Sequence, residues 1–265
     1  MINFVKAEQI FKKYVENYDL EDDKIKLKLI HTYGVVKLSE YIAKDLKLDE
    51  ENIELAKIIA LLHDIGRFEQ LKQCHTFDNT PENDHAEYGV KILFEEKMIE
   101  EFLEDRKYDE IIFNSIKYHN KYKLPDELEG DILLHSKLIR DSDKADNFRV
   151  KNVETIETLL DISAEQLGSE EITDVIYNQY MNEELVLIPN IKTNMDSWVS
   201  YLAFIFDFNF SSGLKYIMEN DYLNKAIDRI NYSNIKTKER MEEIRKVSLN
   251  YIEKRINENK KSSAN

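Results

Sequence analysis

The residues best suited to chemistry are His63 and Asp64, which directly follow the most apolar run of the chain, Ile58–Leu62. This run predicts a helix buried on most of its circumference, with His63 on the stripe that faces the core. A buried polar pair must be hydrogen-bonded or coordinated. The pair therefore indicates either a hydrogen-bonded partner in the core or a metal ion, and taken alone it favours the hydrogen bond.

Further histidines change that balance, because all six histidines of the chain lie within its first 135 residues. Most of them fall on the apolar stripe or in the first turn of a predicted helix. Imidazole nitrogens and carboxylate oxygens suit Fe, Mn, Co, Ni or Zn in an open site, and the single cysteine excludes a thiolate cluster. We therefore predict a site for a divalent transition metal, with room for two ions. Its ligands are taken from His31, His63, Asp64, His85, His119 and Asp143.

The hydrophobic periodicity predicts that separate helices position these residues. The stretch Asp49-Glu50-Glu51-Asn52 is expected to start the helix that carries His63, with Gly66 as its stop, and Asp84 is expected as an N-cap in a capping box with Glu87. Gly89, one turn after His85, suggests close approach of another element. Residues 70–84 form a polar loop long enough for a lid or binding role. The predicted helices cover residues 1–20, 24–46, 50–65, 85–103, 108–122 and 131–148.

Beyond Arg149 the sequence contains no histidine, so we expect one domain over residues 1–150 and a helical extension, residues 151–265, packed on it. Only six glycines and three prolines in 265 residues favour an all-α fold throughout. Residues 186–189 are expected to be extended or a loop, and residues 260–265 disordered. The helices predicted in the extension cover residues 152–161, 169–181, 196–208, 212–219, 222–230 and 237–257.

The formal net charge of −15 argues against a general affinity for nucleic acid, because phosphate contacts need a basic field. A protein of this charge that handles phosphates needs bound cations or a few well-placed basic residues. No apolar run approaches the roughly 20 residues of a membrane span, and the N-terminus shows no secretory signal. With one cysteine, the chain is expected to be cytoplasmic and to bind no membrane. The sequence carries no signal for an oligomeric state.

The ordered set of histidines and aspartates resembles the HD superfamily of metal-dependent phosphohydrolases. The resemblance covers residues 25–150 and includes the local contexts His31-Thr-Tyr-Gly-Val, Leu-Leu-His63-Asp64-Ile-Gly-Arg, His85-Ala-Glu-Tyr-Gly-Val-Lys-Ile-Leu, Tyr-His119-Asn and Arg140-Asp-Ser-Asp143-Lys-Ala-Asp. The stretch after His119 reads Lys-Tyr-Lys-Leu-Pro and lacks the Gly-Tyr-Pro of the cyclic-di-GMP-cleaving HD-GYP branch. This difference puts a cyclic dinucleotide substrate in doubt and leaves the metal ligands untouched.

The resemblance implies an all-α HD-domain helical bundle in which His31, His63, Asp64 and Asp143 hold one metal. In binuclear members, the histidines that match His85 and His119 bind a second metal, and the aspartate that matches Asp64 bridges the two. We predict hydrolysis of a phosphoester or phosphoanhydride of a nucleotide or similar small phosphorylated molecule through a metal-activated water, which Asp64 would orient. Candidates to stabilise the phosphate and the leaving group are Arg67, Arg140 and Lys144.

Several of these residues have a structural alternative. His85 and His119 could orient ligands or phosphate without binding a metal, and Arg67 could simply place a charge at a helix C-terminus. Asp146 rivals Asp143 as a ligand but fits better as a neighbour of a ligand or as an ion-pair partner of Arg140. Purely structural roles are expected for His135 in the core, His75 and Cys74 in the loop, the aromatic side chains of residues 198–208 and the basic helix face of residues 235–265.

Two other functions fit the same ligand set. One is a di-iron oxygenase, because some members of the HD superfamily resemble that chemistry. The other is a non-catalytic nucleotide-binding or sensing module. An oxygen-dependent product would indicate the first, and tight nucleotide binding without turnover would indicate the second. The complete set of ligands favours the hydrolase over the binding module, since binding alone does not require six of them.

Overall fold

The computed structural model describes residues 2–77, 79–80 and 82–262. These residues form helices joined by turns, and none of them lies in a β-strand apart from an isolated bridge between Thr80 and Asn83. The prediction of an all-α fold is thus confirmed. The chain divides into two compact units, Met1–Asp143 and Lys144–Asn265. The division lies within one long helix, α8 (Gly130–Val153), before the boundary expected after residue 150.

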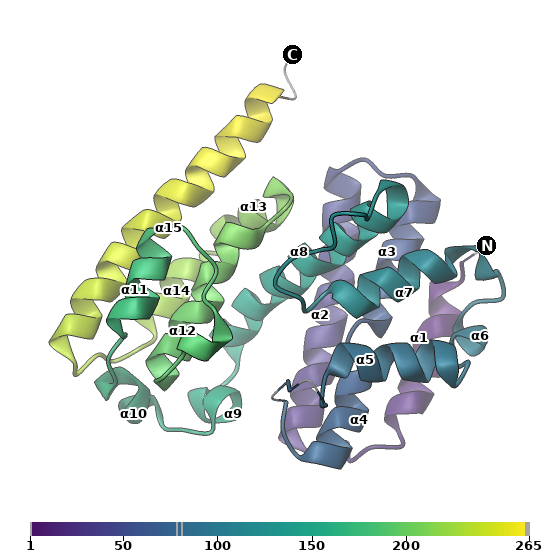
Figure 1. The fold of residues 1–265 in the computed structure, drawn as a ribbon, viewed down its shortest axis with the longest axis horizontal. Helices are drawn as coiled ribbons and strands as arrows, with labels where there is room; N and C mark the ends of the chain where they lie inside the picture. The colour runs from purple at the N-terminus through teal and green to yellow at the C-terminus, as the bar shows by residue number, and fades with distance from the viewer. Residues whose placement is uncertain (1, 78, 81, 263–265) are drawn as a thin grey trace. The chain divides into compact units, whose positions relative to one another are not determined.

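The first unit contains eight α-helical segments of the described chain, labelled α1 to α8 in Figure 1. Helix α2 packs along α3, and α5 packs on both α4 and α7. The helix start predicted at residues 49–52 is confirmed, with Asp49 as an N-cap whose side chain accepts from the amide of Asn52, and the N-cap predicted at Asp84 is confirmed as well. Asp84 accepts from the amide of Ala86, one residue earlier than a capping box with Glu87 requires. The segments are α1 (Phe4–Val15), α2 (Asp23–Asp45), α3 (Glu50–Leu62), α4 (Ile65–Cys74), α5 (His85–Val90), α6 (Ile99–Phe102), α7 (Asp109–Tyr118) and the start of α8.

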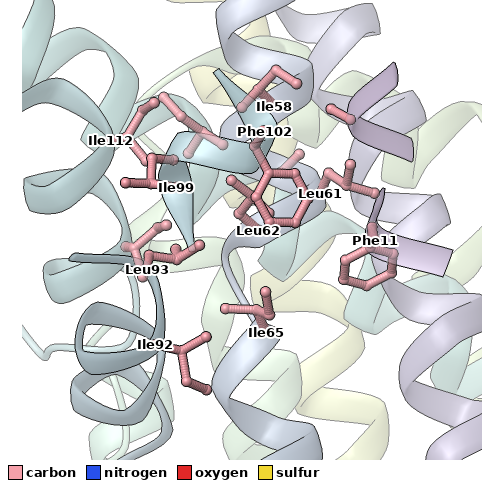
Figure 2. Packing of buried hydrophobic residues seen from close by; sticks show 14 of the residues in the cluster. Phe11, Ile58, Leu61, Leu62, Ile65, Ile92, Leu93, Ile99, Phe102 and Ile112 are labelled. Atoms are coloured by element: carbon pink, nitrogen blue, oxygen red, sulfur yellow. The ribbon is translucent and has the colours of Figure 1, made fainter. Parts of the chain in front are cut away.

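Helix α3 forms the centre of the first unit's hydrophobic core, as its apolar run predicts. All of its apolar side chains are buried, and Figure 2 shows Phe11, Ile65 and Ile112 from α1, α4 and α7 packed around Leu61 and Leu62. Burial of each such side chain stabilises the fold by roughly 1.5–3 kcal/mol. Because this helix is enclosed on nearly all sides, the residues at its C-terminal end are carried into the interior of the unit.

Gly66 was expected to stop the helix that carries His63, and this prediction is wrong. Helix α3 ends at Leu62, and Gly66 lies in the first turn of α4. A Cβ atom at Gly66 would lie 2.2 Å from the carbonyl oxygen of His85 and 2.5 Å from the amide nitrogen of Gly89. Glycine is therefore required because the backbones of α4 and α5 touch here. The close approach that Gly89 suggested is confirmed by the same contact.

Other boundaries in the first unit also differ from the prediction. Residues 70–74 belong to α4, so the loop begins only at His75, which takes a left-handed conformation with φ 56°. The single helix expected over residues 85–103 is interrupted by a π-helical turn (Lys91–Glu95) and by a left-handed Lys97. Helices α1 and α7 end earlier than predicted, at Val15 and Tyr118, whereas α8 extends beyond the predicted residues 131–148 at both ends.

The regular secondary structure of the second unit is all helical in its described residues. The helix expected over residues 196–208 begins at Asn194 instead, with Thr193 and Asp196 forming a capping box, and gives way to a 3-10 turn at Ala203–Asp207. Trp198 is buried in the core of this unit, as predicted. Its helices are the rest of α8, α9 (Ile156–Leu160), α10 (Ala164–Ser169), α11 (Asp174–Met181), α12 (Asn194–Leu202), α13 (Ser211–Glu219), α14 (Tyr222–Asp228) and α15 (Ile235–Ser262).

Helix α15 extends to Ser262, so the disorder expected from residue 260 is wrong for residues 260–262, and residues 263–265 lie outside the described part of the chain. The segment expected to be extended or a loop ends in a 3-10 turn, Ile188–Asn190. Packing of the C-terminal extension on the first domain stays a prediction. Among the described helices, none is both long and apolar enough to cross a membrane.

Candidate metal centre

The centre of the site is the carboxylate of Asp64, which lies in the two-residue junction between α3 and α4. Its Oδ2 atom lies 3.6 Å from Nε2 of His63 and 3.9 Å from Nε2 of His31. Its Oδ1 atom lies 3.3 Å from Nε2 of His85 and 3.7 Å from Nε2 of His119. The two oxygens of one buried carboxylate thus face two different pairs of histidines.

Asp143 joins the site through His31, whose Nε2 lies 3.0 Å from Oδ1 of Asp143. We call His31, His63, Asp64 and Asp143 the first group, and Asp64, His85 and His119 the second group. Within each trio that shares Asp64, the candidate ligand atoms lie within 4.8 Å of one another. The structure therefore brings together all six residues that the sequence predicts as ligands.

The hydrogen bonds of Nδ1 define the tautomers of His63 and His119. Nδ1 lies 2.7 Å from the carbonyl oxygen of Ala60 in His63, and 2.7 Å from that of Ile116 in His119. A carbonyl oxygen can only accept, so Nδ1 carries the proton and Nε2 of the neutral ring keeps its lone pair. Helix geometry explains both bonds, because each histidine follows the last residue of its helix and reaches a carbonyl three residues back.

The arrangement of lone pairs fits a bound cation. Nε2 of His63 is buried and has no hydrogen-bond partner among the described residues. Nε2 of His85 lies only 3.0 Å from Nε2 of His119, beside the negatively charged Asp64. Lone pairs that face one another around a carboxylate are unfavourable unless a positive ion lies among them. Imidazole and carboxylate donors without thiolate suit a divalent transition metal, so the residues present fit one or two such ions.

The pKa shifts give the protonation states that metal ligands require. Burial lowers the pKa of His63 to about 4, and burial together with the charge of Arg67 lowers the pKa of His85 well below its usual range. Burial would raise the pKa of Asp64, but the nearby charge of Lys28 and the neighbouring His63 outweigh it and hold that pKa well below its usual value. At neutral pH these imidazoles are therefore neutral and the carboxylate is ionised, as in metal-binding sites.

Residues 29–147 match the family model of the HD domain, and this region contains all six ligand residues. This region of the chain is therefore an HD domain. Comparison with curated proteins and comparison with solved structures each find no match. The HD domain accounts for the helices that supply the ligands, from α2 to α8. The match ends at residue 147, so the second unit has no counterpart in these comparisons beyond its first four residues.

Lys28 is a residue of the HD site that the sequence analysis missed. Its Nζ lies 2.9 Å from Oδ2 of Asp64, while Nε of Arg67 lies 3.5 Å from Oδ1. Both cations also lie near the ring of Phe77, at 5.3 and 5.6 Å from its centroid. Lys28 precedes His31 by three residues on α2, so its spacing from a predicted ligand could have identified it.

Arg67 contacts Asp64, but not from a helix C-terminus, which was the alternative expected for it. It lies in the first turn of α4, and its Nη1 donates to the carbonyl oxygen of Phe77 at 2.7 Å and to Oε1 of Gln70 at 2.8 Å. Arg67 therefore joins the carboxylate of the HD site to the loop that follows α4.

Arg140 was expected to stabilise a phosphate, but its buried guanidinium instead caps the C-terminal end of α7. Nη1 donates to the carbonyl oxygens of Tyr118 at 3.2 Å, His119 at 3.3 Å and Lys121. A cation is stabilised there because the last carbonyls of a helix have no partner within it and carry partial negative charge. Arg140 thereby supports the backbone that carries His119.

The remaining predicted residues lie as follows. Lys144 begins the second unit and forms an ion pair with Asp207 at 2.8 Å, and its catalytic role stays a prediction. Asp146 forms an ion pair with Arg149 at 2.6 Å, whereas Asp143 contacts His31, so the structure favours Asp143 as the ligand.

The two histidines outside the site have the structural roles expected for them. His135 is buried, and its Nε2 lies 2.9 Å from Oδ1 of Asn52 on α3. His75 is exposed at the end of α4.

Proposed function

We propose that this HD-domain protein is a metal-dependent phosphohydrolase that hydrolyses a phosphoester or phosphoanhydride of a nucleotide or similar small molecule. The observation that supports it most is the single carboxylate of Asp64, whose two oxygens face two different pairs of imidazoles. The first group would hold one divalent cation and the second group another. Such cations, when bound, supply a Lewis acid for the phosphoryl oxygens and lower the pKa of a water molecule.

The protein's own residues would prepare the phosphate for attack. Lys28 and Arg67 place positive charge beside the two oxygens of the Asp64 carboxylate, at 2.9 Å from Oδ2 and 3.5 Å from Oδ1. In a chain of net charge −15 these two side chains supply the local attraction that a phosphate needs. We infer that they orient the phosphoryl oxygens, and that Asp64 accepts a hydrogen bond from the attacking water.

The acidic character of the chain supports a small substrate rather than nucleic acid, because a polyanion would be repelled over most of the surface. A nucleotide combines a phosphate for the cations with a base that an aromatic ring can contact, and Phe77 lies beside both cations. We further infer that the protein acts in the reducing cytoplasm, since a single cysteine cannot form an internal disulfide.

The test is a substrate screen with defined metals. The protein is stripped of metal, reloaded separately with Mn, Fe, Co, Ni and Zn, and assayed for phosphate or nucleotide release from nucleotides and generic phosphoesters. We expect turnover with at least one metal. A product that forms only with iron and oxygen would indicate an oxygenase instead. Tight nucleotide binding without turnover would indicate a sensing module, and absence of turnover with every metal would overturn the proposal.

Lys28→Met tests the role of the cation at the site. Loss of a charge-assisted hydrogen bond costs about 1.5–3 kcal/mol, so we expect kcat/KM to fall by roughly 10- to 100-fold. Lys37→Met is the matched control, since Lys37 is an exposed lysine on the same helix. Equal kcat/KM in the two variants would contradict the assignment of Lys28 to phosphate binding.

A further inference from the structure

The ligand histidines of this site are oriented in two different ways. His63 and His119 each hold Nδ1 against a carbonyl oxygen of the helix that they end, three residues back. His85 is the first residue of α5, so no helical turn precedes it that could supply such a carbonyl. Its Nδ1 instead lies 2.9 Å from Oδ1 of Asn79, a side chain of the loop that follows α4. The orientation of His85 therefore depends on this loop.

A chain of hydrogen bonds defines which atom of Asn79 faces His85. Nε2 of Gln70 lies 3.1 Å from the carbonyl oxygen of Asn83, which can only accept, so this atom of Gln70 is the donor. The same Nε2 lies 3.1 Å from the Asn79 atom that contacts His85. Nη1 of Arg67, which can only donate, lies 3.4 Å from that atom. The atom must be the amide oxygen, and Nδ1 of His85 must be the donor.

The geometry points to Asn79 as a positioning residue for the second metal subsite. By accepting from Nδ1 of His85, its amide oxygen keeps the lone pair of Nε2 directed at Oδ1 of Asp64, 3.3 Å away, and at Nε2 of His119. The loop thus determines the affinity of the second group for a divalent metal, while the histidines of the first group lie on α2 and at the end of α3. This inference rests on the metal centre of the proposed function.

The position of Asn79 separates this role from a contribution to folding. Asn79 is exposed, whereas His85 and Gln70 are buried. The side chain of Asn79 therefore adds nothing to the hydrophobic core. Its interactions are polar ones that converge on a single oxygen. Removal of such an outer partner of a ligand histidine typically weakens metal binding by about 10- to 100-fold. Replacement of an exposed side chain should change the melting temperature little.

The experiment is a titration of the metal-free full-length protein with cobalt(II), followed by calorimetry and by the visible absorption of the bound ion. Wild type is compared with Asn79→Ala, with Asn79→Asp, and with the control Asn114→Ala, whose side chain donates a hydrogen bond to the carbonyl oxygen of Glu110 on its own helix. We expect two ions in wild type and in the control. Asn79→Ala should bind the first ion with unchanged affinity and the second about 10- to 100-fold more weakly. Asn79→Asp should restore the second affinity, because its carboxylate also accepts from Nδ1.

Three results would overturn the inference. These are wild-type affinities for both ions in Asn79→Ala, an equal loss of both affinities, or binding of only one ion to wild type. Because the measurement counts metal and needs no turnover, its outcome is separate from that of the substrate screen. A chain that binds two ions with the expected difference but hydrolyses no phosphate would retain this inference and lose the proposed function.

Discussion

The two groups of ligands around Asp64 are supported by different kinds of interaction. The histidines of the first group lie on the 23-residue helix α2 and at the end of α3, which pack along each other within the core. The second group depends on α5, only six residues long, and on the C-terminal end of α7. Hydrophobic packing of α2 on α3 therefore positions the first group. The helices of the second group also place Val90, Ile112 and Ile116 in the core, but its histidines depend in addition on polar contacts and on one close backbone contact. We expect the first group to bind metal more tightly.

Asp64→Asn should have the largest effect, because Asp64 is the one residue that both groups share. The amide removes the negative charge and one oxygen ligand while keeping the shape of the side chain. We expect bound metal to fall in both subsites and activity to fall by about 1,000-fold or more, equivalent to about 4 kcal/mol. Metal content per chain and kcat/KM are the measurements. Asp126→Asn, at an exposed surface pair, is the control. Loss of only one metal would contradict a shared carboxylate.

Gly66→Ala should separate the two groups through the contact between α4 and α5. The new Cβ would overlap backbone atoms of His85 and Gly89, which no side-chain rotation can relieve. We expect a loss of about 3 kcal/mol in the free energy of unfolding and a weaker second subsite. Gly130→Ala is the matched control, since its Cβ meets nothing within 4 Å and only its φ of +53° is strained. Equal destabilisation in the two variants would show that the contact is not tight.

Arg140→Met tests the polar support of His119. Methionine keeps an apolar stem but leaves the carbonyls of residues 118–121 without the guanidinium. We expect a loss of about 2 kcal/mol in unfolding free energy and weaker binding of the second metal only. Arg106→Met is the control near the other end of α7, where an exposed ion pair with Asp109 contributes little. If the first metal is weakened equally, Arg140 supports the whole site rather than one group.

His135 makes a smaller, pH-dependent contribution to the stability of the fold. It links α8 to Asn52 of α3, and these two helices carry Asp143 and His63 of the first group. Burial lowers its pKa to about 4 from a value of 6.5, so below pH 6.5 the unfolded chain takes up a proton that the folded chain excludes. Stability is therefore lost as the pH falls from 6.5 toward 4, by about 1.4 kcal/mol at pH 5.5.

The variant His135→Gln should lack this loss, because glutamine can donate to Asn52 without titrating. Urea unfolding of the metal-free proteins at pH 7 and pH 5.5 measures the difference, and the other histidines are common to both. An equal loss of stability in wild type and variant would contradict the role given to His135.

The sequence was sufficient for features that depend on residues close together in the chain. The apolar run before His63 predicted a buried helix, the start of that helix at residues 49–52 and the N-cap at Asp84 were predicted correctly, and the ordered set of histidines and aspartates predicted an HD domain. Gly66 was placed at the right junction but given the wrong role. A glycine after a helix is most often a stop, and only the approach of α5 shows that this one allows two backbones to touch.

Residues that act through partners distant in the sequence were not found in this way. Lys28 and Asp64 are 36 residues apart, and Arg140 and His119 are 21 apart. In the sequence, Lys28 is one of many lysines that could face solvent, and Arg140 lies close enough to Asp143 to suggest a contact with phosphate. The contact that distinguishes these possibilities exists only after the chain has folded.

Local sequence patterns were sufficient to predict the helical fold and the N-cap at Asp84, because periodicity and capping act over a few residues. The ordered set of histidines and aspartates was sufficient to predict the HD domain and its six candidate ligands. The tertiary structure decided that the two oxygens of Asp64 face separate groups, that Arg140 supports α7, and that the loop of Asn79 orients His85. These features depend on which helices pack together and at what distance. They arise from the burial of α3 among its neighbours, which brings distant polar groups within reach of one carboxylate.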